Sequence, residues 1–417
     1  MSLADSARKG GWEVGTCVLP KFMFPEVYSS SGRRESIEKN PSHEACPLSV
    51  NSYLSALSTT FTSFTIEHHM KWGPLLNKSR EYDFTTVDRM VDWGVENGFT
   101  VKGHVLIWHV TSPKFINDLP PAEFSKVVRN HIFTVMRHFR GRVRQWDVVN
   151  EALAPDGSMA DTIFLRKMGP GYIAQCFRWA HEADPDAFLI YNDNKVEGWG
   201  LGSPHSDKAE GFFNLLRDLI EEGAPVHGAG LQGHLVASGT GVRKPPTPKA
   251  VANQIRRLST LNLKVNLSEF DVRTSSLPDH LDPYEVQKEI VRDILSACFS
   301  QPNFTGVYFW GVSDAVSWVE DFYGNVDKPL ILDSSYSPKP SHQGVLDAMS
   351  SPTAPPLPPA LHDKSSLLPP PSGWGSSWMQ ASPPPSPSPS TSETATTSEA
   401  YGNSLPDWEL EAKTDSG

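Results

Sequence analysis

The sequence has little positive charge, few cysteines and no long hydrophobic run. Its 417 residues include 37 Lys and Arg against 48 Asp and Glu, which gives a formal net charge of -11. A protein that binds nucleic acid needs a basic face for the phosphates, so we expect no nucleic-acid partner. No window approaches the roughly 20 consecutive apolar residues of a transmembrane helix, and we therefore expect no membrane partner.

The four cysteines are Cys17, Cys46, Cys176 and Cys298. Their spacing matches neither a CxxC pair nor a zinc-ligand pattern, so it predicts no disulfide framework and leaves the redox compartment open. The first residues, Met-Ser-Leu-Ala-Asp-Ser-Ala-Arg-Lys-Gly-Gly, contain no apolar stretch of the length that a signal peptide requires.

Composition changes sharply near Ser350. Residues 351–417 are rich in proline, serine and threonine, and such a segment cannot bury enough apolar surface to offset the entropy lost on ordering. We therefore expect two regions: a folded domain over 1–350, and a disordered Pro/Ser/Thr-rich tail over 351–417.

Segments with strand and helix character alternate along the first region. Bulky apolar runs predict strands, and apolar residues three or four apart predict helices. The predicted strands are 12–18, 61–66, 100–108, 143–149, 188–191, 226–231, 263–268 and 306–310. The predicted helices are 50–57, 85–97, 122–139, 171–183, 207–222, 248–260, 283–298 and 341–349. Eight strands that alternate with eight helices predict an α/β fold of the (β/α)8 TIM-barrel type.

Two of the predicted strands end in a carboxylate. One runs through Trp146, Val148 and Val149 and stops at Asn150-Glu151, and another leads from Leu263 to Glu269. In a barrel of this type the active site lies at the carboxyl ends of the strands, so we expect the two glutamates to face one another. A pair of carboxylates is what glycoside hydrolysis requires.

The other predicted strand ends carry amides, imidazoles, carboxylates and indoles. Sugars are bound by this mixture, because hydroxyl groups need polar partners and ring faces stack on tryptophan. The residues at these ends are Glu67, His68, Lys71, Trp108, His109, Asn192, Asp193, Gln232, His234, Asp271, Trp310 and, in the following loop, Trp318.

Several short runs in this order resemble glycoside hydrolase family 10, the endo-β-1,4-xylanases. The resemblance covers about residues 12–348. The runs are Trp146-Asp-Val-Val-Asn-Glu-Ala152, Gly103-His-Val-Leu-Ile-Trp-His109, Gly230-Leu-Gln-Gly-His-Leu235 and Trp310-Gly-Val-Ser-Asp314, followed by Ser317-Trp318.

The resemblance implies an endo-acting, retaining hydrolase that cleaves β-1,4-xylosidic bonds of xylan by double displacement. Glu151 would act as the general acid and then as the base, and Glu269 as the nucleophile. His234 would hydrogen-bond the nucleophile and keep it ionised. Asn150 would bind the 2-hydroxyl of the sugar at the cleavage point.

The resemblance also implies a set of residues that bind the sugars on the non-reducing side. Glu67, Lys71 and His109 would contact them, and Gln232 is expected to bind substrate as well. His68 is expected here too, although the family usually has asparagine at that position. Trp310 and Trp318 would shape the pocket.

Three further departures from the family pattern bear on the substrate. Thr111 and Phe115 stand where glutamine and tryptophan are usual, and the nucleophile lies in Ser-Glu-Phe-Asp rather than Thr-Glu-Leu-Asp. His104 is interpreted as structural because it falls within a predicted strand, and Trp146 as a core residue. Asp193 and Asp271 are interpreted as hydrogen-bond partners of the site residues.

Three alternatives to hydrolysis remain open. A transglycosylase would use the same site and pass the sugar to another sugar, and a non-catalytic carbohydrate-binding barrel would share the fold alone. An interaction protein would act through the Pro/Ser-rich tail. No metal site and no cofactor are predicted, and we expect a monomer whose partner is a polysaccharide. The substrate slightly favours an extracellular or cell-wall location, although no export signal is recognised.

Overall fold

A computed structural model describes residues 2–25, 50–198, 205–238 and 245–350. The predicted disorder of 351–417 lies outside the described residues, as does Cys46. Among the described helices, none combines the length and the apolar character needed to cross a bilayer.

Eight parallel strands form a closed barrel. They are β1 (Glu13–Val18), β2 (Ser63–Ile66), β3 (Thr100–Gly103), β4 (Gln145–Asn150), β5 (Phe188–Asp193), β6 (Gly228–Leu231), β8 (Lys264–Arg273) and β9 (Phe304–Phe309). Each strand pairs in parallel with its neighbour, β1 pairs with β9, and the pairing of β6 with β8 closes the ring. A ninth described strand, β7 (His234–Val236), pairs with the second half of β8 outside this ring.

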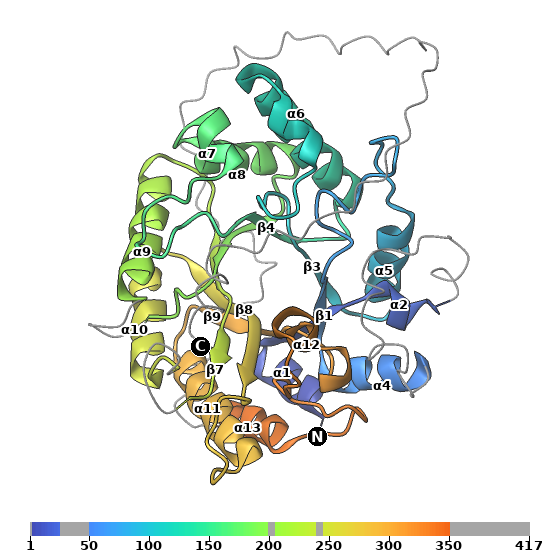
Figure 1. Cartoon of the computed structure of the whole chain (residues 1–417), viewed down its shortest axis with the longest axis vertical. Helices are drawn as coiled ribbons and strands as arrows, with labels where there is room; N and C mark the ends of the chain where they lie inside the picture. Colours follow the sequence, from blue (N-terminus) through green and yellow to red (C-terminus); the bar gives the residue numbers. More distant parts are fainter. Residues whose placement is uncertain (1, 26–49, 199–204, 239–244, 351–417) are drawn as a thin grey trace. The chain divides into compact units, whose positions relative to one another are not determined.

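Helices surround the barrel (Figure 1). The main ones, in chain order, are α4 (Val50–Thr60), α5 (Thr85–Glu96), α6 (Pro121–Phe139), α8 (Tyr172–Ala183), α9 (Ser206–Glu221), α10 (Pro248–Ser259), α11 (Pro283–Phe299) and α13 (Pro340–Met349). Shorter ones are α1 (Leu3–Gly10), α2 (Pro20–Met23), α7 (Ile163–Met168), α12 (Trp318–Tyr323) and the 3-10 turns η2 (Lys114–Asp118) and η4 (Asp314–Val316).

Local sequence explains where several helices begin. Pro248 and Pro283 occupy the first turns of α10 and α11, where the missing N–H costs nothing. The preceding residues cap these helices: Thr247 accepts from the backbone N–H of Ala250, and Asp282 from that of Tyr284. The first residues of α10 and α11 are therefore set by neighbouring residues in the sequence, a proline and a capping side chain.

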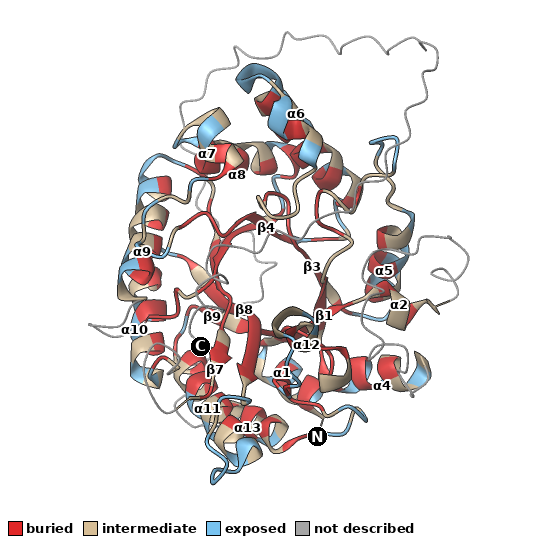
Figure 2. Ribbon diagram, viewed as in Figure 1, coloured by how far each residue is buried: buried red, intermediate tan, exposed pale blue. Residues whose placement is uncertain are grey.

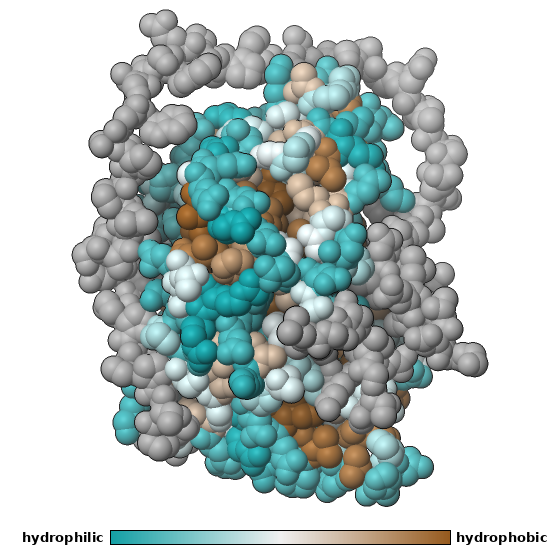
Figure 3. All heavy atoms as spheres, turned by 90° about the vertical axis from the view of Figure 1, so that its left-hand side faces the viewer, coloured by the Kyte–Doolittle hydropathy of each residue, from teal (hydrophilic) through white to brown (hydrophobic). Residues whose placement is uncertain are grey.

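The core lies between the strands and the helices and inside the barrel. Most strand residues are buried, and each outer helix buries one face and exposes the other (Figure 2). The side of the molecule that carries α9 and α10 is mostly hydrophilic, with hydrophobic side chains gathered in smaller areas (Figure 3). This is the pattern expected of amphipathic helices packed on a sheet.

Polar side chains fill the amino-terminal end of the barrel. Tyr308 donates to Glu13 at 2.6 Å, and the amide of Gln145 donates to both Glu13 and Tyr308. Glu13 and Gln145 are the first residues of β1 and β4. This cluster satisfies its buried polar groups internally, at the opposite end of the strands from Asn150 and Glu151.

The predicted (β/α)8 barrel is confirmed, with differences at element ends. The strand predicted over 100–108 ends at Gly103, so His104 does not lie within it. The strand predicted over 263–268 continues to Arg273, because β7 pairs with residues 271–273 and extends it. Glu269 therefore lies inside β8 rather than at its end. Helix α1, which was not predicted, is capped by Ser2 and by Gly11 in the left-handed conformation.

Candidate active site

The carboxyl ends of β4 and β8 bring the two predicted catalytic glutamates into one buried network. Glu151 directly follows β4, and Glu269 lies on β8. Both side chains are almost fully buried, with 6% of each residue exposed. Asn150, the last residue of β4, accepts hydrogen bonds from two amides that also bond the glutamates.

Glu151 is held by two donors and by an unusual backbone. The indole N–H of Trp108 donates to its Oε2 at 2.9 Å, and the amide of Gln232 donates to its Oε1 at 2.8 Å. Its φ is 54°, in the left-handed region that residues other than glycine seldom adopt. The position of this carboxyl is thus fixed from both its side chain and its main chain.

Glu269 is bonded on both carboxylate oxygens. The amide of Asn192 donates to Oε1 at 2.7 Å, and Nε2 of His234 lies 3.3 Å from Oε2. Burial would raise the pKa of the Glu269 carboxyl, but the bond from His234 and the nearby His104 and Lys71 outweigh it and lower the pKa to about 2. Glu269 is therefore ionised at neutral pH.

His234 is positioned by a second carboxylate. Its Nδ1 lies 2.8 Å from Oδ2 of Asp271, and the same oxygen accepts the indole N–H of Trp318 at 2.9 Å. Burial would lower the pKa of His234, but Asp271 and Glu269 reverse that effect and raise it to about 10. The imidazole is therefore protonated at neutral pH and donates to both carboxylates.

Amide side chains connect the two glutamates. Oδ1 of Asn150 accepts from Asn192 at 2.9 Å and from Gln232 at 3.3 Å, and these two amides also donate to Glu269 and Glu151 respectively. Oδ1 of Asn150 is therefore the shared acceptor through which the two amides, and with them the two glutamates, are connected.

A cationic and aromatic group lies beside the glutamates. The residue Lys71 is 8% exposed, and its ammonium lies 4.7 Å from the centre of the Trp108 ring. Burial lowers the pKa of Lys71, while the negative charges of Glu269, Glu67 and Glu151 act in the opposite direction. Lys71 is thus electrostatically coupled to both glutamates and to Glu67.

The remaining predicted sugar-binding residues follow β2 and β3. Burial raises the pKa of Glu67, whose Oε2 lies 3.6 Å from the thiol sulfur of Cys17. Burial and the charge of Lys71 lower the pKa of His68 to about 3, so its imidazole is neutral. His109 lies half-buried directly after Trp108.

Two tryptophan residues after β9 pack against His234. Trp310 directly follows the strand and packs edge-on against His234, with ring centres 6.4 Å apart. Trp318 begins α12, and its ring centre is 4.9 Å from that of His234. Both indoles therefore lie next to His234, the partner of Glu269.

His104 packs against one of these two tryptophans. Its ring packs edge-on against Trp310 at 5.1 Å, its Nδ1 lies 2.9 Å from Asp147, and it is among the groups that lower the pKa of Glu269. The placement of His104 within a strand is wrong, because β3 ends at Gly103, while its interpretation as a structural residue stays a prediction. Trp108 and Asn192 were recognised at strand ends, but their bonds to the glutamates could not be read from spacing.

Two of the sequence departures, Thr111 and Phe115, lie in the segment between β3 and α6. The carbonyl of Thr111 accepts the N–H of Gly73 at 2.9 Å, and the guanidinium of Arg80 lies over the ring of Phe115 at 4.8 Å. Both residues are half-buried. Their described contacts are thus with loop residues rather than with the glutamates.

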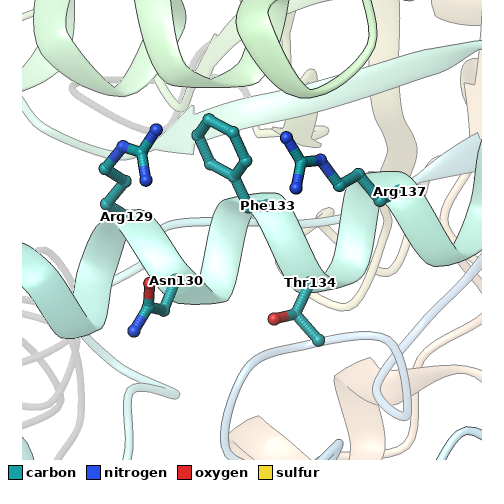
Figure 4. Close-up of a pocket in the computed structure, with 5 residues that line it drawn as sticks. All are labelled: Arg129, Asn130, Phe133, Thr134 and Arg137. Atoms are coloured by element: carbon teal, nitrogen blue, oxygen red, sulfur yellow. The ribbon is translucent and has the colours of Figure 1, made fainter. Parts of the chain in front are cut away.

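A shallow cavity of about 260 Å³ lies elsewhere, on α6. Arg129 and Arg137 flank the ring of Phe133, and Asn130 and Thr134 complete the lining (Figure 4). It contains none of the predicted site residues. Within the described ranges no group of three or more histidine, cysteine, aspartate or glutamate residues is arranged to hold a metal ion, and Cys17, Cys176 and Cys298 are unpaired.

This chain is similar in sequence and fold to known proteins. The chain is 32% identical over 300 residues to endo-1,4-beta-xylanase B of Thermotoga neapolitana, covering 71% of this chain and 83% of that protein. It is 33% identical over 310 residues to the beta-1,4-xylanase of Dictyoglomus thermophilum, covering 70% and 83%. The structure of xylanase 10B from Thermotoga petrophila in complex with xylobiose superposes with a TM-score of 0.71 and 30% identity, covering 84% of this chain and 97% of that one.

The family model named Glycosyl hydrolase family 10 matches residues 33–348. The match begins after β1, yet β1 completes the barrel by pairing with both β2 and β9. The resemblance found in the sequence is confirmed by this match and by the relatives: the chain belongs to glycosyl hydrolase family 10.

Proposed function

We propose that this protein is an endo-1,4-β-xylanase that hydrolyses xylan with retention of configuration. The curated relatives named above are xylanases, and one structural relative was solved with xylobiose. The observation that carries the proposal is the buried network that joins Glu151 to Glu269 through Gln232, Asn150 and Asn192. It supplies two carboxylates in different environments, as double displacement requires.

Glu269 is the nucleophile in this proposal. Its carboxylate attacks the anomeric carbon, and the bond to the leaving glycosidic oxygen breaks as the glycosyl-enzyme ester forms. The low pKa of about 2 keeps Glu269 charged for this step. His234 holds the carboxylate and Asp271 holds His234, so the reacting oxygen needs little reorganisation.

Glu151 is the acid and base. Its carboxyl proton passes to the departing oxygen in the first step, and in the second step it takes a proton from the water that cleaves the ester. Retaining chemistry places the two carboxyl groups about 5 to 5.5 Å apart, with no space for a water between them. Trp108 and Gln232 hold Glu151 in a fixed orientation for both proton transfers.

The sugar at the cleavage point lies between these groups. Asn150 donates its amide to the 2-hydroxyl, a contact that strengthens in the transition state. The sugars on the non-reducing side are bound by Glu67, His68, Lys71 and His109. Gln232 binds substrate next to Asn150 and Glu151. The hydrophobic wall beside His234 is formed by Trp310 and Trp318.

Azide trapping tests both assignments. Without the carboxylate of Glu269, azide attacks an aryl β-xylobioside directly, so Glu269→Gly is expected to give an α-glycosyl azide. Glu151→Ala still forms the glycosyl-enzyme, and azide then gives a β-glycosyl azide. Either variant should lose about 10²-fold or more of its activity on xylan.

The control is Glu13→Gln, because Glu13 lies at the amino-terminal end of the barrel and should leave azide chemistry unaffected. Identical anomers from the two variants would refute the division of roles. A folded wild-type protein that is inert on xylan and on aryl xylosides would refute the enzyme assignment. If longer oligosaccharides form and the number of reducing ends does not increase, the protein is a transglycosylase, which shares the first step.

A further inference from the structure

The main chain at Glu151 is held in a conformation that it would not adopt freely. Residues other than glycine seldom adopt the left-handed region, and Glu151 has a φ of 54°. Such a conformation persists only where the surrounding structure fixes it. The groups that fix the backbone of residues 151–153 therefore also fix the direction of the Glu151 side chain.

The neighbouring strand β5 supplies these groups. The backbone N–H of Glu151 donates to the carbonyl of Asn192 at 3.0 Å. The N–H of Ala152 donates to the hydroxyl of Tyr191 at 3.2 Å, and the N–H of Leu153 to Oδ2 of Asp193 at 3.3 Å. Three consecutive N–H groups thus end on three consecutive residues of β5, two of them through side chains.

Tyr191 and Asp193 are linked to each other and to a buried lysine. The hydroxyl of Tyr191 donates to Oδ2 of Asp193 at 2.6 Å. The ammonium of Lys208, from α9, lies 2.9 Å from Oδ1 of Asp193 and 2.8 Å from Oδ1 of Asn194. The side chains of Lys208 and Asp193 are 4% and 0% exposed, so this ion pair is shielded from solvent.

We propose that Tyr191, Asp193 and Lys208 are positioning residues for the general acid. They hold the backbone after β4 so that the Glu151 carboxyl is directed at the glycosidic oxygen, and they touch no substrate themselves. The inference rests on the proposed role of Glu151. It predicts a defect that appears only where the leaving group needs a proton.

Tyr191→Phe tests this, because it removes one hydroxyl that accepts from Ala152 and donates to Asp193. We measure kcat/KM, which reports the first chemical step, on xylo-oligosaccharides and on 2,4-dinitrophenyl β-xylobioside. The alkoxide of a sugar must be protonated as it leaves, whereas dinitrophenolate leaves without help. We expect about a tenfold loss on the oligosaccharides and less than about a twofold change on the dinitrophenyl substrate.

Tyr308→Phe is the matched control. Tyr308 is as buried as Tyr191 and also donates to a carboxylate at 2.6 Å, but that carboxylate is Glu13, at the opposite end of the barrel. This variant should lose thermal stability to a similar degree while the ratio of the two kcat/KM values stays at the wild-type value.

A second variant guards against misfolding. Lys208→Met alone leaves the Asp193 carboxylate buried without its cation, whereas Lys208→Met combined with Asp193→Asn removes both charges. If the combined variant folds, it should show the same selective loss on oligosaccharides. An equal loss on both substrates in Tyr191→Phe, or no loss on either, would overturn the proposal.

Glu151→Ala separates this inference from the assignment on which it rests. It should show the same selectivity in an extreme form, with a loss of about 10²–10⁴-fold on oligosaccharides alone. If Glu151→Ala shows no dependence on the leaving group, the acid assignment itself fails. If it does and Tyr191→Phe does not, only the positioning role fails.

Discussion

Nε2 of His234 lies 3.3 Å from Oε2 of Glu269, while Nδ1 of the same ring lies 2.8 Å from Asp271. A neutral imidazole could donate to only one of these carboxylates. The pKa of His234 is about 10 and that of Glu269 is about 2. At neutral pH a protonated ring therefore lies between two carboxylates, and that of Glu269 is ionised. The charge on Glu269 therefore depends on His234 directly.

His234→Ala should shift the acid limb of the activity profile to higher pH. His234 stabilises the ionised form of Glu269, so its loss raises the pKa of Glu269 and protonates the nucleophile at a higher pH. We expect the midpoint of the acid limb of kcat/KM to move to higher pH by about one unit or more. A shift of one unit corresponds to a loss of about 1.4 kcal/mol in the stabilisation of the ionised carboxylate. The profile is measured on an aryl β-xylobioside between pH 3 and 9.

His138→Ala is the control for this shift. His138 bonds Asp88 at 2.8 Å on the outer side of the barrel, so its loss removes a similar pair without touching the site. An unchanged acid limb in His234→Ala would show that other groups, such as Lys71 or His104, keep Glu269 ionised.

Asn192→Ala should reduce turnover more than binding. Its amide donates to both Asn150 and Glu269, and its Oδ1 accepts the hydroxyl of Ser268. A hydrogen bond to a charged group contributes about 1.5–3 kcal/mol, which corresponds to about a 12- to 160-fold fall in kcat/KM. The measurement is steady-state kinetics with a melting curve for each variant.

Asn192→Asp makes the test sharper, because it replaces the donor with a second carboxylate next to Glu269. The repulsion should raise the pKa of Glu269 and move the acid limb to higher pH, which a loss of packing alone would not do. If Asn192→Ala and Asn192→Asp have the same pH profile, Asn192 acts on position alone.

The barrel and the two glutamates could be predicted because their signals are local. Bulky apolar residues up to Val149 followed by Asn150 and Glu151 mark a buried strand and its polar end. The same pattern leads to Glu269, although pairing with β7 carries that strand on to Arg273. That pairing joins residues 234–236 to 271–273, and no spacing within either segment indicates it.

The contacts that fix the site could not be predicted in this way. Lys208 is one charged residue on an amphipathic helix, and in sequence it cannot be told from the solvated residues around it, yet it is buried against Asp193. His104 was taken for a strand residue because the apolar run continues to Trp108. The strand ends instead at Gly103, which packs so closely on Trp146 that a Cβ atom there would lie 2.1 Å from the ring.

His68→Ala should raise KM and leave kcat unchanged. We propose that His68 contacts a sugar on the non-reducing side, away from the reacting atoms, so its bond contributes equally to substrate and transition state. A neutral hydrogen bond contributes about 0.5–1.5 kcal/mol, or about a 2- to 12-fold rise in KM. Because the pKa of His68 is about 3, the rise should be the same at every pH above about 5.

His342→Ala provides the comparison for His68→Ala, since His342 is a half-buried histidine on the outer helix α13. A fall in kcat with KM unchanged would place His68 at the reaction centre instead. An unaltered KM on both short and long xylo-oligosaccharides would remove it from the substrate-binding set.

Lys339→Met should destabilise the barrel strongly, although Lys339 lies outside the site. Its ammonium lies 2.9 Å from Asp314, both side chains are at most 3% exposed, and it also donates to the carbonyls of Lys328 and Leu330. Loss of one partner of a buried pair costs about 3–5 kcal/mol, because the other charge is left without compensation. Urea denaturation measures this change in the free energy of unfolding.

The exposed pair Lys288–Glu285 on α11 is the matched comparison, since its side chains are 29% and 55% exposed. Lys288→Met should change the free energy of unfolding by no more than about 1 kcal/mol. Replacing both members of the buried pair, as Asp314→Leu with Lys339→Met, should recover part of the loss, because no isolated charge remains. If Lys339→Met is as mild as Lys288→Met, solvent reaches Asp314 and the pair does not hold the segment between Trp310 and Trp318.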